Sequence, residues 1–313
     1  MQKLLAIVGP TAVGKSAVAL EVAKRLNVEI VSADSMQVYL GVDIGTAKPS
    51  LQELKEVKHH LINLVIPSQD FSVAEYQKLA REAINEIESR ARYPILVGGS
   101  GLYIRAVIDD LKFPQGLLGS PVRLELEKEA ALKGGEALYF ELKRLDPEAA
   151  KKIHPRNVRR VIRALEVIKV TGRLFSDFQK EWEKRESVYD LIMVGLDVPR
   201  DELFTKIEQR IERQLEEGVL EEVKMLLSQG YGGAITAKQA LGYKELADYL
   251  EGKCSLAVAV DQFKRRTRNF AKRQLTWFRR DPRINWIDVS GKTPSEVTDD
   301  IISYLQKKNF EEA

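Results

Sequence analysis

The sequence predicts an α/β fold in which a parallel sheet is flanked by helices. In the first third of the 313 residues, short apolar runs alternate with segments of helical periodicity, which is the pattern of βαβ units. A glycine-rich loop joins the first apolar run to the helical segment that follows it. The composition, 44% hydrophobic and 30% charged, argues against a disordered, fibrous or membrane protein.

The elements are expected in a regular order along the chain. Residues 41–50, with two glycines and a proline, should form an excursion over the strand tips, and Gly172 should end a helix. Beyond residue 227 the pattern indicates basic helices as far as Arg280, followed by a terminal segment that we expect to be peripheral. Strands are expected at 4–8, 30–32, 95–98 and 190–196, and helices at 17–26, 76–87, 158–170 and 202–227.

A change in character near residues 114–121 predicts two domains. From 122 to 186 the sequence is charged and favours helices, without the apolar runs of the first third. We therefore predict an all-helical insertion domain over 119–187. Residues 1–118 and 188–313 are expected to form the core, including its basic C-terminal helices.

Positive charge is concentrated in two stretches, although the net charge is only +3. Residues 151–163 hold six basic residues and no acidic one, and residues 238–283 hold twelve basic residues against five acidic ones. Such segregation suggests a polyanionic partner. Two solvated helix faces would give the same pattern, so charge alone leaves both interpretations open.

Residues 9–16 match the phosphate-binding pattern G-x-x-x-x-G-K-[ST] between a predicted strand and a predicted helix. The glycines let successive N–H groups converge on phosphate oxygens, and the helix N-terminus adds positive charge. Lys15 can neutralise the terminal phosphate, and Ser16 can ligate Mg²⁺ together with that phosphate and waters. The motif predicts a P-loop NTPase-like core but does not say whether the phosphates belong to a nucleotide. The predicted phosphate-binding residues are Gly9, Pro10, Thr11, Ala12, Val13, Gly14, Lys15 and Ser16.

An acidic residue, Asp34, stands where the second strand should end. Parallel strands deliver their carboxyl ends to one edge of a sheet, so Asp34 should face the phosphate-binding loop. A carboxylate there could accept a proton from a nucleophile, bind a metal or cap the next helix, and the residues alone leave these three roles open.

Several segments in combination resemble the bacterial tRNA dimethylallyltransferases, also called tRNA isopentenyltransferases. The resemblance covers most of the chain. It rests on the loop 9–16 and on DSMQVY at 34–39, DIGTAKP at 43–49, HH at 59–60, VGGSGLY at 97–103, IHP at 153–155, RALEV at 163–167, IEQR at 207–210, LGY at 241–243 and AKRQLTWFR at 271–279.

The resemblance implies a prenyltransferase that moves the dimethylallyl group of dimethylallyl diphosphate to N6 of adenosine 37 of tRNA, beside the anticodon, and releases diphosphate. The loop 9–16 would then hold the diphosphate of the donor, with Mg²⁺, and no nucleotide would be hydrolysed. Asp34 would act as the general base on the adenine amine. Thr11 and Lys15 would act at the diphosphate, which Arg210 would reach from the later helix.

The resemblance also implies a surface for the tRNA anticodon stem-loop, with the adenine extruded from its stack. Ser100 stands where the family usually has Thr, which keeps the hydroxyl and loses a methyl group. Tyr243 or Trp277 is a candidate for stacking on a loop base, although a tryptophan at position 277 is more often a core residue. The expected tRNA contacts are Asp34, Ser35, Met36, Gln37, Ser100, Arg123, Arg159, Arg160, Arg163, Gln239, Tyr243, Lys244, Lys272, Arg273, Gln274 and Arg279.

The single cysteine, Cys254, excludes a disulfide scaffold and a zinc finger of the kind that eukaryotic relatives can carry, and it fits a reducing cytoplasm. The histidines His59, His60 and His154 lack accompanying ligands, so we expect caps or ion pairs and not a metal site. The apolar run at 4–8 is too short for a signal peptide or a spanning helix. We expect a cytoplasmic monomer that binds neither membranes nor DNA.

Two other functions fit parts of the sequence. A small-molecule or nucleotide kinase would also use a phosphate-binding loop and an acid at the second strand. Against it, the strand at 95–98 runs into glycines and not into the aspartate of a metal-holding NTPase strand. A non-catalytic RNA-binding protein with a nucleotide-sensing loop would suit the basic stretches but gives Asp34 no role.

Overall fold

The computed structural model describes residues 2–113, 120–233, 240–308 and 310. The chain divides into two compact units, Met1–Ile108 with Ser187–Ala313, and Asp109–Glu186. In the first unit, Val188 N donates a hydrogen bond to Ile108 O at 2.9 Å. The chain therefore leaves and re-enters the first unit at adjacent positions.

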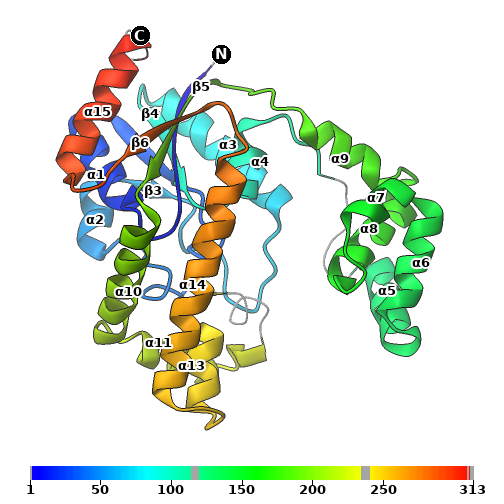
Figure 1. The fold of residues 1–313 in the computed structure, drawn as a ribbon. Coiled ribbons are helices and arrows are strands. Elements are labelled where there is room, and N and C mark those ends of the chain that lie inside the picture. Colours follow the sequence, from blue (N-terminus) through cyan, green and yellow to red (C-terminus); the bar gives the residue numbers. More distant parts are fainter. Residues whose placement is uncertain (1, 114–119, 234–239, 309, 311–313) are drawn as a thin grey trace. The chain divides into compact units, whose positions relative to one another are not determined.

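A six-stranded parallel sheet in the order β3-β2-β4-β1-β5-β6 runs through the described part of the first unit (Figure 1). Every neighbouring pair is parallel, so the carboxyl ends share one edge. Val8 lies opposite Gly98 on one side and Gly195 on the other. The α/β prediction is confirmed. The strands are β1 (Lys3–Val8), β2 (Val28–Ser32), β3 (His59–His60), β4 (Tyr93–Gly98), β5 (Asp190–Asp197) and β6 (Ile284–Asp288).

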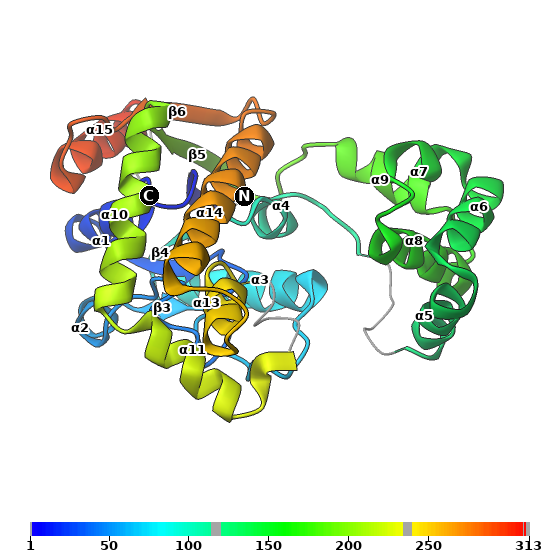
Figure 2. The same cartoon turned by 60° about the horizontal axis from the view of Figure 1, so that its bottom comes forward.

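Helices cover both faces of the sheet, which explains why its central strands are apolar almost throughout. The face that bears Leu5 and Ile7 packs against α1 (Lys15–Arg25), α10 (Arg200–Glu216), α14 (Leu256–Phe278) and α15 (Pro294–Lys307). The face that bears Leu4 and Ala6 packs against α3 (Val73–Ser89) and α4 (Gly101–Ile108). Figure 2 shows α10 and α14 lying side by side.

Two expectations about the C-terminal part are wrong. The terminal segment is not peripheral, because β6 pairs with β5 and Ile301 and Leu305 of α15 are buried in the core. The helix expected at 202–227 is two helices, α10 and α11 (Val219–Ser228), separated at Gly218. The buried residues keep a helical spacing across the break, which is why the pattern resembles one long helix.

The remaining helices of the first unit frame the excursion after β2. This excursion is the whole connection from β2 to β3, residues 33–58, which is longer than the expected 41–50 and contains α2 (Leu51–Glu56), a helix that the sequence pattern does not predict. A small apolar core joins Val38 and Val42 of the excursion to α11 and to α13 (Tyr243–Leu250). A single 3-10 turn, Tyr231–Gly233, follows α11. The excursion is thus packed against helices and does not simply cross the strand tips.

The named elements in the described part of the second unit are all helices, joined by short loops. Its core is built from Leu126, Leu142, Leu165 and other aliphatic side chains. Gly172 caps the end of α8, as expected. None of the helices described in either unit has the length and hydropathy that a bilayer crossing requires. The helices of this unit are α5 (Pro121–Lys133), α6 (Gly135–Leu145), α7 (Pro147–Lys152), α8 (Val158–Thr171) and α9 (Phe175–Glu183).

Candidate functional site

The loop 9–16 connects β1 to α1 at the carboxyl edge of the sheet. Gly14 has φ 103°, in the left-handed region that favours glycine, and α1 starts at the next residue without a side-chain cap. The first N–H groups of α1 are therefore available to an anion at the positive end of the helix.

Two cations stand beside this loop. Lys15 Nζ donates to Pro10 O at 2.6 Å, and NH1 of Arg210, from α10, donates to Thr11 Oγ1 at 3.2 Å. Burial, and then the charge of Arg210, lower the pKa of Lys15 to about 7, while Asp34 acts in the opposite direction. Burial lowers the pKa of Arg210 as well, again opposed by Asp34. The charges of Lys15, Asp34 and Arg210 thus influence one another, and Thr11 joins them through its hydrogen bond with Arg210.

Asp34 follows β2 and is half-buried. Its Oδ1 accepts a hydrogen bond from Met36 N at 2.8 Å. In the described residues, Oδ2 accepts no hydrogen bond. One carboxylate oxygen is therefore held by the backbone while the other is available to a substrate proton, an arrangement suited to a general base.

Ser100, Ser35 and Gln37 lie close to Asp34 in the loops after β4 and β2. Ser100 Oγ accepts from Ser35 N at 3.1 Å and lies 3.3 Å from Ser35 Oγ. Gln37 Oε1 accepts from Ser32 Oγ at 2.9 Å. These residues and Met36 are half-buried, so each still presents part of its side chain to solvent.

Gln274 does not lie where an RNA contact would. It is buried in α14, where its Oε1 accepts from Thr11 N at 2.8 Å and its Nε2 donates to Gly99 O at 2.9 Å. The expectation that Gln274 contacts tRNA is corrected, because the side chain is buried and its oxygen and nitrogen each bind the backbone of the loops after β1 and β4.

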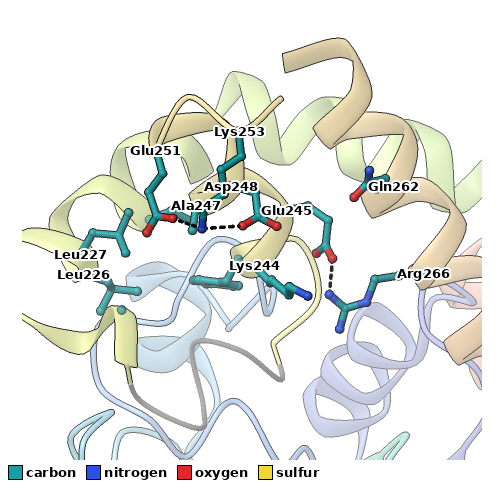
Figure 3. A pocket seen from close by; sticks show the side chains of 13 residues that line it. Leu226, Leu227, Lys244, Glu245, Ala247, Asp248, Glu251, Lys253, Gln262 and Arg266 are labelled. Atoms are coloured by element: carbon teal, nitrogen blue, oxygen red, sulfur yellow. Dashed lines mark hydrogen bonds and ion pairs between the residues drawn. The ribbon is translucent and has the colours of Figure 1, made fainter. Parts of the chain in front are cut away.

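Tyr243 is also turned inward. It is 2% exposed, and its hydroxyl donates to Glu222. The expected stacking on a tRNA base is therefore wrong, since no ring face is accessible. Its neighbour Lys244 is exposed and lines a pocket of about 640 Å³ among α11, α13 and α14. Figure 3 shows this pocket, in which Glu245 pairs with Arg266.

The exposed face of α14 carries several predicted residues. Lys272 and Arg273 are exposed and form no ion pair with any described residue. Arg279 pairs with Asp197 at 2.9 Å. Trp277 is 43% exposed, which excludes the core interpretation and leaves a ring surface open to solvent.

Other basic residues of α14 are neutralised by neighbouring acids. Lys264 and Arg268 pair with Glu212 and Glu208 of α10 at 2.8 and 3.4 Å. Part of the positive charge that is clustered in residues 238–283 of the sequence is thus neutralised by acidic neighbours in the fold. The positive charge of α14 that forms no ion pair with a described residue is concentrated at Lys272 and Arg273.

In the second unit, Arg159 and Arg160 are exposed on α8. Arg123 is 7% exposed and pairs with the buried Glu166 at 2.9 Å, so it is not the accessible contact that was expected. Arg163 also binds Glu166, at 2.7 Å. The remaining predicted contact, Gln239, lies outside the described residues.

The histidines serve as local partners, as the sequence analysis expects. His60 Nε2 lies 2.6 Å from Glu29 Oε2, His59 Nδ1 donates to Val57 O at 2.8 Å, and His154 Nδ1 accepts from Arg156 N at 3.1 Å. Within the described ranges, no three His, Cys, Asp or Glu side chains form a group that could hold a metal. Ser16, exposed in the first turn of α1, is thus the one predicted magnesium ligand that the loop supplies.

Two side chains that the sequence analysis did not single out organise the surroundings of the site. Glu222 binds the backbone of the excursion after β2, and Lys48 Nζ lies 2.6 Å from Asp43 Oδ1. Lys48 lies in the DIGTAKP segment at 43–49, one of the segments that resemble the family. Glu222 is one of several acidic residues on an amphipathic helix, and the sequence does not distinguish it from its exposed neighbours.

Known proteins resemble this chain along nearly its whole length. The family model described as IPP transferase matches residues 37–281. The tRNA dimethylallyltransferase of Carboxydothermus hydrogenoformans is 48% identical over 309 residues, 99% of each chain. The crystal structure of the tRNA isopentenylpyrophosphate transferase of Bacillus halodurans is 45% identical, with a TM-score of 0.71 over 99% of this chain and 98% of that one.

A structure of a eukaryotic dimethylallyltransferase acting on tRNA is similar at lower identity. It is 28% identical, with a TM-score of 0.83 over 99% of this chain and 80% of that one. The family match covers more than half of the sequence, and the bacterial relatives align from end to end. The chain therefore belongs to the IPP transferase family.

Proposed function

We propose that this chain transfers the dimethylallyl group of dimethylallyl diphosphate to N6 of adenosine 37 of tRNA and releases diphosphate. The observation that carries the proposal is the arrangement at the carboxyl edge of the sheet, where Arg210 of α10 donates to Thr11 of the phosphate-binding loop and Asp34 follows β2. The charge of Asp34 raises the pKa of both Lys15 and Arg210, in opposition to burial. An anion site and a base on one edge of the sheet suit a reaction in which an anionic group leaves as an amine loses its proton. The names of the bacterial relatives agree with this reaction.

The loop would bind the diphosphate and stabilise it as the leaving group. When the C1–O bond breaks, negative charge grows on the diphosphate, and preorganised N–H groups and cations stabilise it without rearranging. Lys15 and Arg210 supply positive charge. Thr11 Oγ1 accepts from Arg210, so the Thr11 hydroxyl proton can point to a bridging oxygen.

Asp34 would remove the proton from the attacking amine. The lone pair of an exocyclic adenine amine is delocalised into the ring, so the amine becomes a better nucleophile as its proton is taken. The carboxylate oxygen that does not bind Met36 N, Oδ2, has lone pairs that can accept this proton. Base extrusion is required, because a base within the anticodon-loop stack cannot reach a half-buried acid.

Magnesium fits the donor set only as a companion of the diphosphate. The loop offers the Ser16 hydroxyl, and Mg²⁺ commonly keeps several waters and binds substrate phosphates. Ser16 would hold the ion together with diphosphate oxygens and waters. The ion would supply additional charge neutralisation at the leaving group.

The tRNA would meet exposed basic residues on both units, Lys272 and Arg273 on α14 and Arg159 and Arg160 on α8. Contacts of this kind bind phosphates and give affinity without reading sequence. Ser35, Met36 and Gln37 would line the pocket for the adenine. A tRNA substrate supports a cytoplasmic location for the proposed activity.

One assay tests the proposal. The purified chain is incubated with unmodified tRNA, Mg²⁺ and labelled dimethylallyl diphosphate, and again with ATP in place of the prenyl donor. We expect label in tRNA, dependent on Mg²⁺, and no ATP turnover. Turnover of ATP without label would select a kinase, and tRNA binding without either reaction would select a non-catalytic RNA-binding protein.

A further inference from the structure

A buried carboxylate outside the proposed chemistry, Glu222, holds three consecutive backbone amides. It lies on α11 and is 7% exposed. Its Oε2 accepts from Asp43 N and Ile44 N, both at 2.8 Å, and its Oε1 accepts from Gly45 N at 3.2 Å. No described cation forms an ion pair with it, so these hydrogen bonds are what offset the cost of burying the charge.

The same carboxylate reaches a second element. Glu222 Oε1 also accepts from the Tyr243 hydroxyl at the start of α13. A Cβ atom added to Gly45 would lie 2.3 Å from a ring carbon of Tyr243, so only glycine permits this approach. Glu222 therefore joins the excursion after β2 to α13 at a point where the two are in direct contact.

The carbonyl groups of this segment are fixed from the other side. Gln214 Nε2, from α10, donates to Ile44 O at 2.7 Å and to Gly45 O at 3.0 Å. The N–H and C=O groups of Ile44 and Gly45 are thus all bound by two side chains, Glu222 and Gln214. Such a segment has little freedom to change its backbone conformation.

The residues that follow this fixed segment, Thr46 and Ala47, are hydrogen-bonded to the side chain of Gln37. Its Nε2 donates to Thr46 O and Ala47 O, each at 3.3 Å, and Thr46 Oγ1 donates to Val42 O at 2.6 Å. The segment 43–47 therefore sets the orientation of the Gln37 amide, three residues after Asp34. A change at residues 43–45 would alter which way the Gln37 donor and acceptor point.

A second set of contacts connects Glu222, through Tyr243, to the backbone around Lys244. Gly242 N donates to Glu245 Oε2 at 3.2 Å, and Glu245 pairs with Arg266 of α14 (Figure 3). The two residues on either side of Lys244 are thus both held, Tyr243 by Glu222 and Glu245 by Arg266. The exposed Lys244 ammonium is thereby presented from a fixed backbone.

We propose that Glu222 is a positioning residue for the tRNA substrate, which acts by fixing Gln37 and Lys244 relative to each other. The inference rests on the proposed function, because it assigns these two residues to the tRNA side. Neither the loop 9–16 nor Asp34 is hydrogen-bonded to Glu222, so binding of the prenyl donor should not depend on it.

The test is the kinetics of Glu222→Gln, which keeps the shape but replaces one acceptor oxygen with a donor that cannot bind an N–H group. We expect KM for tRNA to rise on the order of 10-fold to 100-fold, because unpaired buried amides are costly. KM for dimethylallyl diphosphate and kcat at saturating tRNA should stay within about twofold. Glu221→Gln, a neutralisation at an exposed neighbouring position of the same helix, is the matched control and should change neither constant.

Tyr243→Phe provides an independent test should Glu222→Gln fold poorly. It removes one hydrogen bond and keeps the ring, so KM for tRNA should rise by a smaller factor, about 3-fold to 10-fold. Amide hydrogen exchange on the full chain should be faster at residues 43–45 in both variants and unchanged in β1 and β4.

An unchanged KM for tRNA in both variants would overturn the inference. A rise of KM for the prenyl donor equal to that for tRNA would do the same, because it would show a general structural role. Failure of the proposed function gives a different result: the unmodified chain itself would then transfer no label to tRNA.

Discussion

The side-chain oxygen of Gln274 accepts a hydrogen bond from the backbone N–H of Thr11 at 2.8 Å, so α14 helps to shape the phosphate-binding loop. The amide nitrogen of Gln274 binds Gly99 O. One side chain therefore joins the phosphate-binding loop to the loop that carries Ser100. The two substrates of the proposed reaction would meet on either side of it.

Gln274→Ala should impair the use of the prenyl donor. The change leaves Thr11 N and Gly99 O without their partner, at a cost of about 1–3 kcal/mol, so kcat/KM for dimethylallyl diphosphate should fall on the order of 10-fold to 100-fold. Steady-state kinetics with saturating tRNA measure this. Lys272→Gln, two residues away on the exposed face of the same helix, is the control and should leave the donor constants unchanged. A defect confined to tRNA affinity would show that Gln274 contacts RNA after all.

Asp34→Ala should lower turnover on the order of 10²-fold to 10⁴-fold while the fold survives, because the general base is lost. Asp34→Asn should give a similar loss even though its oxygen can still accept from Met36 N. Single-turnover transfer of label into tRNA measures the rate, and circular dichroism checks the fold. Wild-type turnover in either purified variant would remove Asp34 from the chemistry.

Lys15 should make donor binding dependent on pH. Its pKa is lowered to about 7, so the free protein loses this charge as the pH rises above that value. The terminal phosphate has a pKa near about 6 and is already ionised there. Affinity for dimethylallyl diphosphate should therefore fall between about pH 7.5 and 9.5, by at most about tenfold per unit.

Bound diphosphate favours the charged form of Lys15, so binding at high pH should take up protons. Calorimetry at pH 8.5 in two buffers of different ionisation enthalpy measures this uptake. Lys15→Gln should bind weakly and show no uptake over the same range. Equal uptake in the variant and in the unmodified chain would assign the proton to another group.

Affinity for tRNA should decrease steeply with salt. Each phosphate contact contributes roughly 0.7–0.9 to the slope of log K against log salt, so Lys272→Gln with Arg273→Gln should reduce the slope by about 1–2. Lys292→Gln, which removes a lysine paired with Asp300 on the terminal helix, should leave the slope unchanged. Identical slopes in all three proteins would exclude the exposed face of α14 from the interface.

Glu166→Gln should destabilise the helical unit. Glu166 is fully buried and binds Arg123, Arg163 and Ser120, and losing one member of a buried pair costs about 3–5 kcal/mol. Amide exchange of peptides within 120–183 in the full chain measures this cost. Burial raises the pKa of Glu166, but its hydrogen bonds to Arg163 and Ser120 and the charge of Arg123 hold the pKa below the usual value.

The contribution of the Glu166 carboxylate to stability should depend on pH. Because the folded pKa is lowered, the carboxylate stabilises the fold above its unfolded pKa of about 4.5, and this contribution disappears as pH falls through the folded pKa. The difference between Glu166→Gln and the unmodified chain should therefore shrink at acid pH. A difference that is constant with pH would mean that packing, and not charge, is the cause.

The sequence predicted the central strands well because each is an apolar run between turn signals. β3 escaped prediction because two residues, His59 and His60, are too few to show a period. β6 is an edge strand of mixed polarity, INWID, and only its pairing with β5 identifies it. The break at Gly218 was invisible because the apolar spacing on either side is in phase.

Lys15 could be predicted as part of the site because a known phosphate-binding motif contains it. Asp34 could be predicted because the end of a parallel strand places it at the same edge of the sheet as that motif. The site was not predictable where a polar residue turns inward. Gln274 and Tyr243 lie on amphipathic helices, and periodicity cannot tell whether an amide or a phenol at the boundary meets solvent or a buried partner. Their partners are distant in sequence, since Thr11 lies 263 residues from Gln274 and Glu222 lies 21 residues from Tyr243.

The hydrogen bond between Val188 and Ile108 has a practical consequence for protein engineering. It joins the two points of the sheet-bearing unit between which the helical unit is inserted, and all six described strands pair within the sheet-bearing unit. A short turn that links Ile108 to Val188 in place of the helical unit should give a shorter protein, in which affinity for the prenyl donor can be measured without that unit.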